Sequence, residues 1–168
     1  EIRLPRAILG LAVGLSLGLA GAALQGYLRN PLAEPGIIGV STSASLFTVI
    51  VFYTGLSAGF ALLMPLAGIL GATSAVLVLQ SLAGRNASAL TVVLAGVAIS
   101  SFSGALISLA LNFSSNPFAT YEIVFWLLGS VADRGHDQVA IALPFMAVGW
   151  ALLLCLGNPL DALTLGEE

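Results

Sequence analysis

The fold of this chain is decided by residues 7–28, AILGLAVGLSLGLAGAALQGYL, an apolar run without one charged side chain. A helix rises about 1.5 Å per residue, so this run is long enough to cross a hydrocarbon core of roughly 30 Å. It follows the charged segment Arg3-Leu-Pro-Arg6 and precedes the turn-forming segment Asn30-Pro-Leu-Ala-Glu-Pro-Gly36. We therefore expect a membrane-spanning helix with a polar flank at each end.

The composition extends this expectation to the whole chain. Of its 168 residues, 58% are hydrophobic and 8% are charged, whereas ordinary soluble domains carry about 25% charged residues. A soluble fold of this length could not cover so much apolar surface, so lipid must solvate part of it. The net charge of −3 provides no basic face for nucleic acid. The lone Cys155 lies in an apolar run, and we expect it to be a buried small side chain.

Further apolar runs predict an all-α, polytopic helical bundle. Helices are expected because every backbone polar group in lipid needs an internal partner. Five spans are predicted at about 7–28, 37–53, 60–83, 90–111 and 138–157, and a short interfacial or re-entrant helix at 120–131. Because the chain starts at Glu1 rather than Met, we interpret residues 1–168 as one transmembrane domain from a longer protein.

Two of the spans carry small residues at every fourth position, which places them on one helix face. The first stripe allows a neighbouring backbone to approach closely; it consists of Gly10, Gly14, Gly18, Ala22 and Gly26. The second stripe is more polar and consists of Gly96, Ser100, Gly104, Ser108 and Asn112. Two interpretations of the second stripe remain open. It packs helices, with hydroxyls bonded to the preceding turn, or it lines a transport path.

The predicted spans contain no Asp, Glu, Lys, Arg or His. Carriers driven by ion gradients usually keep such a group inside the membrane, which disfavours a self-powered carrier, although a piece of an ion-coupled secondary transporter remains the alternative. No glycine-rich phosphate loop with its lysine is present. His136 stands near Asp133 and Asp137 in a predicted loop, without further ligands for a metal. We therefore predict no catalytic, cofactor or metal site.

Five motifs occur in a recognisable order along the chain. They are Arg3-Leu-Pro-Arg6, the segment 30–36 followed by Gly39-Val-Ser41, Leu94-Ala-Gly-Val-Ala98, Phe125-Trp-Leu-Leu-Gly-Ser130 and Leu165-Gly-Glu-Glu168. Together they resemble the FecCD-type permeases, the membrane subunits of ABC importers for iron-siderophores, haem and cobalamin. The resemblance implies a partial permease of the type with about ten helices, of which this chain would hold the second to the sixth.

The resemblance also implies a function and a set of partners. The chain would belong to a transporter subunit rather than an enzyme, and it would move an iron-siderophore (or haem or cobalamin) chelate across the bacterial inner membrane by alternating access. The implied partners are a second permease subunit (identical or different), two cytoplasmic ATPase subunits that hydrolyse ATP, a periplasmic or lipid-anchored substrate-binding protein, the chelate and the lipid bilayer. The shared motifs do not distinguish a siderophore from haem or cobalamin.

By the same resemblance, particular residues acquire roles. Arg3 and Arg6 would meet acidic residues of the binding protein, since two guanidiniums one turn apart can hold carboxylates; interfacial anchoring by snorkelling is the alternative. The inner gate would include Arg85, Asn86 and Ser88, and the ATPase contact would include Leu165, Gly166 and Glu167. The inner loop would be shaped by residues whose prolines stop the helix: Asn30, Pro31, Leu32, Ala33, Pro35 and Gly36.

Overall fold

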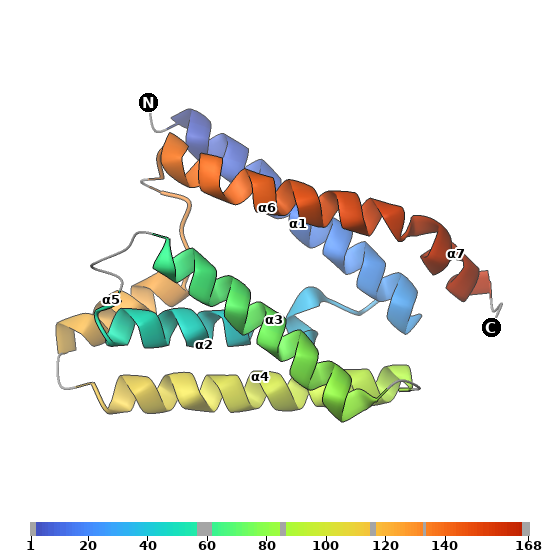
Figure 1. Ribbon diagram of the computed structural model, residues 1–168, viewed down its shortest axis with the longest axis horizontal. Coiled ribbons are helices and arrows are strands. Elements are labelled where there is room, and N and C mark those ends of the chain that lie inside the picture. Colours follow the sequence, from blue (N-terminus) through green and yellow to red (C-terminus); the bar gives the residue numbers. More distant parts are fainter. Residues whose placement is uncertain (1–2, 57–61, 85–86, 115–116, 133, 166–168) are drawn as a thin grey trace. The chain divides into compact units, whose positions relative to one another are not determined.

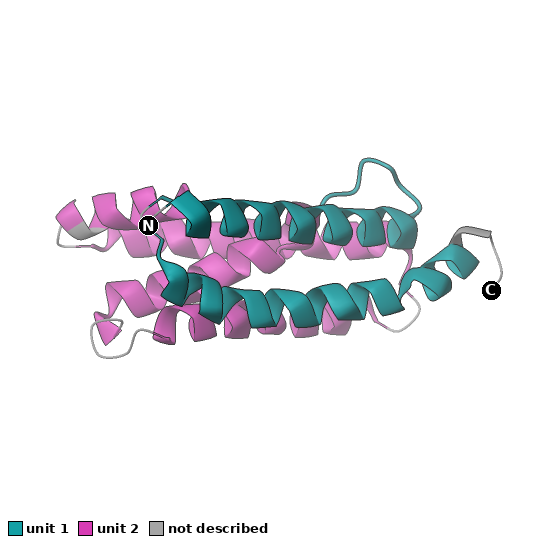
Figure 2. Ribbon diagram, turned by 90° about the horizontal axis from the view of Figure 1, so that it is seen from above, with its two compact units in different colours: residues 1–34, 130–168 teal, residues 35–129 magenta. Residues whose placement is uncertain are grey.

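The computed structural model describes residues 3–56, 62–84, 87–114, 117–132 and 134–165, and these are helical apart from the connecting turns (Figure 1). The elements are α1 (Arg3–Leu28), η1 (a 3₁₀ helix, Pro35–Ile38), α2 (Val40–Tyr53), α3 (Leu63–Ala83), α4 (Ala89–Asn112), α5 (Pro117–Leu127), α6 (His136–Cys155) and α7 (Gly157–Leu165). The chain divides into two compact units, residues 1–34 with 130–168, and residues 35–129 (Figure 2). The single transmembrane domain expected for residues 1–168 stays a prediction.

In the first unit, α1 packs against α6 and α7. The indole Nε1 of Trp150 donates a hydrogen bond to Oγ of Ser16 at 2.9 Å, and that hydroxyl donates to the carbonyl oxygen of Ala12 at 2.8 Å. Further along both segments, a β-carbon added at Gly26 would lie 3.8 Å from Cβ of Leu160. The residue numbers of the two contacts rise together, so α1 runs parallel to α6 and α7.

In the second unit, α2 packs between α3 and α4. Along α3 the residue numbers rise while those of the contacted α2 residues fall. Gly68 lies beside Thr48, and Gly71 lies beside Ser43. The two helices are therefore antiparallel. Its contacts with α4 keep a constant offset in the sequence, because Ser43 meets Ser103 and Tyr53 meets Phe113. Helices α2 and α4 are therefore parallel.

The predicted spans agree with the observed helices except at the second. Among the described residues, four helices are long and apolar enough to cross a membrane, namely α1, α3, α4 and α6. The span expected at 37–53 is instead split into η1 and the 14-residue helix α2. A helix of that length reaches only about 21 Å. The turn arises at Gly39, whose φ of 81° breaks the helical path.

The parallel direction of α1 and α6 limits how many times the chain between them crosses the membrane. If α1 and α6 both cross the bilayer, their parallel direction requires an odd number of crossings between them. Helices α3 and α4 supply two of these. A third crossing would have to come from η1 with α2 or from α5, so the fifth predicted crossing stays a prediction.

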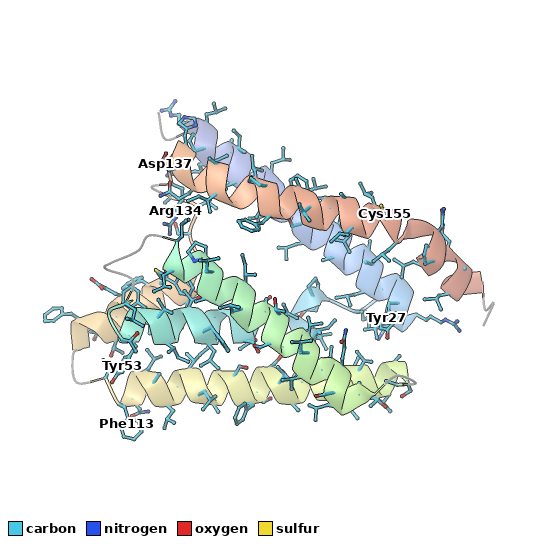
Figure 3. All side chains as sticks on the ribbon, viewed as in Figure 1. Tyr27, Tyr53, Phe113, Arg134, Asp137 and Cys155 are labelled. Carbon is cyan, nitrogen blue, oxygen red and sulfur yellow. The ribbon has the colours of Figure 1, made fainter. Side chains whose placement is uncertain are left out.

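Two packing expectations differ from the structure. Cys155 is exposed rather than buried, because it lies at the last position of α6 with its side chain turned out of the α1–α6 contact (Figure 3). The small-residue stripe of α1 is also open along most of its length. A β-carbon added at Gly10, Gly14 or Gly18 would meet no described atom within 4 Å.

Candidate functional site

The two arginines at the start of the chain lie in the first turn of α1, where both side chains are exposed. Arg3 and Arg6 are three residues apart and therefore lie on one face of the helix. No acidic residue accompanies them in that turn. The positive end of the helix dipole disfavours cations at this position, so the pair is not explained by the local electrostatics of the helix.

The inner loop begins where α1 ends in a Schellman motif. The N–H of Asn30 donates to the carbonyl oxygen of Gln25 at 3.1 Å, and the N–H of Arg29 donates to that of Gly26 at 3.3 Å. This pattern requires a left-handed residue after the helix, a position that glycine usually occupies. Here Arg29 occupies it with a φ of 49°. The chain direction at the loop entrance is therefore fixed by backbone hydrogen bonds.

The turn that follows is held from within and from α1. Oδ1 of Asn30 accepts from the N–H of Leu32 at 2.9 Å, and the carbonyl oxygen of Asn30 accepts from the N–H of Ala33 at 3.1 Å. From the last turns of α1, Nε2 of Gln25 donates to the carbonyl oxygen of Ala33 at 3.4 Å. As a result Ala33 is buried, whereas the side chain of Leu32 is 83% exposed.

The remaining residues of the predicted inner loop belong to the second unit. Pro35 and Gly36 start η1, so this part of the loop is a short helix and not an irregular connection. A proline is tolerated in the first turn of a helix, where its missing N–H is not needed; the predicted role of the prolines in shaping the inner loop stays a prediction.

Of the predicted gate residues, Arg85 and Asn86 lie outside the described residues. Ser88 is the N-cap of α4, and its Oγ accepts a hydrogen bond from the N–H of Thr91 at 3.2 Å. The hydroxyl oxygens of Ser88 and Thr91 are also hydrogen-bonded, at 2.9 Å. Ser88 thus has a structural role, because it accepts a hydrogen bond from an N–H in the first turn of α4 that has no partner within the helix.

The polar stripe of α4 is not uniform. Gly96 is buried against the backbone of η1, where an added β-carbon would come within 2.5 Å of the carbonyl oxygen of Ile37. Oγ of Ser100 is buried and has no described hydrogen-bond partner. Ser108 and Asn112 are exposed, and at Gly104 an added β-carbon would meet no described atom within 4 Å. Gly96 therefore packs the helix, and the lining of a path by this stripe stays a prediction.

A groove of about 500 Å³ opens between α2, α3 and α4 on the surface of the second unit. Its walls are mostly apolar and include Phe47, Val78 and Phe102, and three serines, Ser43, Ser74 and Ser103, also line it. The hydroxyl of each of these serines already has a hydrogen-bond partner. None of the stripe residues predicted to line a path belongs to this groove.

The predicted ATPase contact lies at the end of the described chain. Leu165 is the last residue of α7, and Gly166 and Glu167 lie outside the described residues. The loop expected around His136 is shorter than predicted, because His136 and Asp137 form the first turn of α6, where a carboxylate is favoured by the helix dipole. In the part of the chain that the structure describes, no group of three His, Cys, Asp or Glu could hold a metal ion.

Several structurally important polar residues were not identified from the sequence. Ser43 and Ser103 are both buried and hydrogen-bond to each other between α2 and α4. Gln25 and Trp150 hold the inner loop and the α1–α6 contact. The available signal was that each is a polar or amphipathic side chain inside an apolar run, and such groups usually have a partner across the helix interface.

These features define a multi-pass helical membrane protein in which the buried side chains of Ser43 and Ser103 hydrogen-bond between helices. The chain belongs to the FecCD transport family, whose family model matches residues 1–168. The resemblance inferred from the five motifs is thereby confirmed.

Individual relatives agree with this assignment. The chain is 42% identical to the uncharacterised ABC transporter permease protein YvrB of Bacillus subtilis (strain 168), over 100% of this chain and 48% of that protein. It is 36% identical to the cobalamin import system permease protein BtuC of Halobacterium salinarum, over 99% of this chain and 45% of that protein. The chain thus spans about half the length of these relatives.

A solved structure has the same fold. It is that of an ABC transporter assigned to the metal-chelate type, in an inward-facing conformation, with a TM-score of 0.88 and 29% sequence identity. The match covers 98% of this chain and 52% of that chain. The all-α membrane architecture expected from the sequence is therefore confirmed.

Proposed function

We propose that this chain is part of the membrane-spanning permease subunit of an ABC importer that carries a metal chelate across the bacterial inner membrane. The observation that carries the proposal is the family match over residues 1–168. Relatives described as a cobalamin import permease and a metal-chelate type ABC transporter support the chelate class of cargo. The permease would act without catalysing a reaction, and ATP hydrolysis would take place in partner subunits.

The proposed assembly contains a second permease subunit, two cytoplasmic ATPase subunits and an external substrate-binding protein. ATP binding and hydrolysis would switch the permease between states open to either side of the membrane. Residues 7–28 of α1 and all of α3 and α4 contain no Asp, Glu, Lys, Arg or His. This supports ATP as the energy source, because carriers driven by ion gradients usually retain such groups inside the membrane.

Uptake by the full-length protein with its ATPase and binding-protein partners tests this function. Radiolabelled ferric siderophore and radiolabelled cobalamin are offered side by side to membrane vesicles that contain ATP, a non-hydrolysable ATP analogue or a protonophore. We expect uptake of one of the two chelates that requires hydrolysable ATP and survives the protonophore. Uptake that ignores ATP and collapses with the proton gradient would instead identify an ion-coupled carrier.

Arg3 and Arg6 are the residues that we propose for docking of the binding protein. Their exposure on one face at the helix start, against the helix dipole, supports this role. The variants Arg3→Glu and Arg6→Glu should each weaken binding of the substrate-binding protein to the full-length permease. Arg29→Glu is the matched control, because alternation of the crossings places it at the opposite face. Equal affinities for all three variants would contradict the assignment.

A further inference from the structure

The first turn of α2 is contacted by both neighbouring helices at one residue. Oγ of Ser43 and Oγ of Ser103 on α4 form a hydrogen bond of 2.9 Å, and both residues are at least 95% buried. On the other side, α3 approaches the backbone of the same residue. A β-carbon added at Gly71 would lie 2.5 Å from the carbonyl oxygen of Ser43. Ser43 is therefore the common junction of α2, α3 and α4.

The segment before α2 is held against α4 in a similar way. A β-carbon at Gly96 would lie 2.5 Å from the carbonyl oxygen of Ile37 and 2.8 Å from Cα of Ile38. In return, one at Gly39 would lie 3.0 Å from the carbonyl oxygen of Gly96. The backbone of η1 thus lies directly against Gly96 of α4, and the side chain of Ile99, with Cγ2 2.8 Å from a β-carbon at Gly39, fills the space beside this contact.

The far ends of α2 and α4 are also tied together. The phenolic Oη of Tyr53 donates a hydrogen bond of 3.0 Å to the carbonyl oxygen of Phe113 (Figure 3). This pair has the same sequence separation, 60 residues, as the pair of Ser43 and Ser103. A shift of α2 along α4 would break both bonds together and would leave the two buried hydroxyls without each other.

We propose that η1, α2, α3 and α4 form one locked body that keeps the same internal geometry in every state of the transport cycle. The proposal rests on the proposed function, since that function supplies the cycle. Packed interfaces of this kind have discrete arrangements and do not deform continuously. The buried serine pair and the glycine contacts allow these helices only one arrangement relative to one another. The conformational change of the transport cycle therefore takes place outside this group of helices.

A disulfide across the serine pair tests the lock in the full-length protein with its ATPase partner, in membrane vesicles. The variant Ser43→Cys/Ser103→Cys is made in a Cys155→Ser background and oxidised with air and copper phenanthroline. The hydroxyl separation of 2.9 Å requires only a small shift to reach a disulfide bond of about 2.05 Å. The matched control is Ser43→Cys/Ser108→Cys, because Ser108 is exposed on α4. Cross-links are quantified by mass spectrometry without nucleotide, with ATP and after vanadate trapping.

The lock predicts the same high cross-linking yield in all three states, none in the control, and uptake rates before and after oxidation that agree within about twofold. A yield that depends on the nucleotide state overturns the proposal. So does the absence of a cross-link, or uptake that stops on oxidation and returns on reduction. If the reduced protein shows no ATP-dependent uptake at all, the proposed function fails, while the yields with and without nucleotide still report on the lock.

A second measurement, the distance between two spin labels, tests the lock in a protein that keeps Ser43 and Ser103, in case the double-cysteine variant does not fold. Leu77 on α3 and Leu109 on α4 are exposed, so each tolerates a spin label after replacement by cysteine. The lock predicts one distance distribution between the two labels that is the same without nucleotide and after vanadate trapping. A distribution that moves between these states overturns the proposal.

Discussion

The carbonyl oxygen of Ile37 faces Gly96 so closely that a β-carbon at this glycine would approach it to 2.5 Å. Gly96 therefore leaves room for the backbone of η1 inside the second unit. Gly104, two turns further along the same helix, has no described atom within 4 Å of the equivalent position. Two residues of one sequence stripe thus have different surroundings, and this difference can be tested.

The first prediction concerns these two glycines. Gly96→Ala should lower the free energy of unfolding of the full-length protein by about 1–3 kcal/mol, because the backbone of η1 would have to move. Gly104→Ala should raise it slightly, since alanine is the better helix former by about 1 kcal/mol. Thermal unfolding in detergent, followed by tryptophan fluorescence, measures both. Equal melting temperatures for the two variants would contradict the close approach at Gly96.

The second prediction is a double-mutant cycle on the buried serine pair. Ser43→Ala or Ser103→Ala alone leaves one buried hydroxyl without its partner and should cost about 1–3 kcal/mol of stability. The double variant should cost less than the sum of the two, with a coupling of at least about 0.5 kcal/mol. The exposed Ser101 on α4 provides the control Ser101→Ala, which should change little. Strictly additive effects would mean that the hydroxyls do not depend on each other.

The third prediction addresses the left-handed residue after α1. Arg29 has a φ of 49°, which costs a residue with a β-carbon about 1–2 kcal/mol relative to glycine. Arg29→Gly should therefore be more stable than Arg29→Ala by about 1 kcal/mol, less the larger chain entropy of glycine in the unfolded state. Comparison of the two variants removes the effect of losing the guanidinium. A more stable alanine variant would contradict the Schellman geometry.

The fourth prediction concerns the side chain that holds the inner loop. Gln25→Glu keeps the shape of the side chain but removes the donor to the carbonyl oxygen of Ala33. It should cost about 0.5–1.5 kcal/mol and increase hydrogen exchange at residues 32–34. Exchange read by mass spectrometry, region by region, provides the measurement. The internal control is the N–H of Asn30, which bonds to the backbone of residue 25 and should stay protected. Unchanged exchange at residues 32–34 would show that the side chain does not hold the loop.

The helices themselves were predictable from the sequence, because lipid imposes a strong and local constraint. An apolar run with no charge has to satisfy its backbone internally, and its length gives the crossing. The predicted spans at 7–28, 60–83, 90–111 and 138–157 each correspond to an observed helix. The family was also predictable, since motifs such as Arg3-Leu-Pro-Arg6 and the segment 30–36 are contiguous in the chain and need no tertiary information.

What only the tertiary structure decided is which face of each helix meets a neighbour. Regular spacing predicted close helix packing at Gly18 and left packing or a transport path open at Gly96, yet Gly96 packs against η1 while a β-carbon at Gly18 would meet no described atom within 4 Å. Exposed Cys155 and the paired serines Ser43 and Ser103 could not be distinguished from other side chains in apolar runs. Hydropathy shows that a segment lies in lipid, but contacts between residues far apart in the chain depend on how the helices rotate against each other. The sequence by itself thus determined the four long apolar helices and the family, and the packing of α2 against α4 determined that Ser43 and Ser103 are joined.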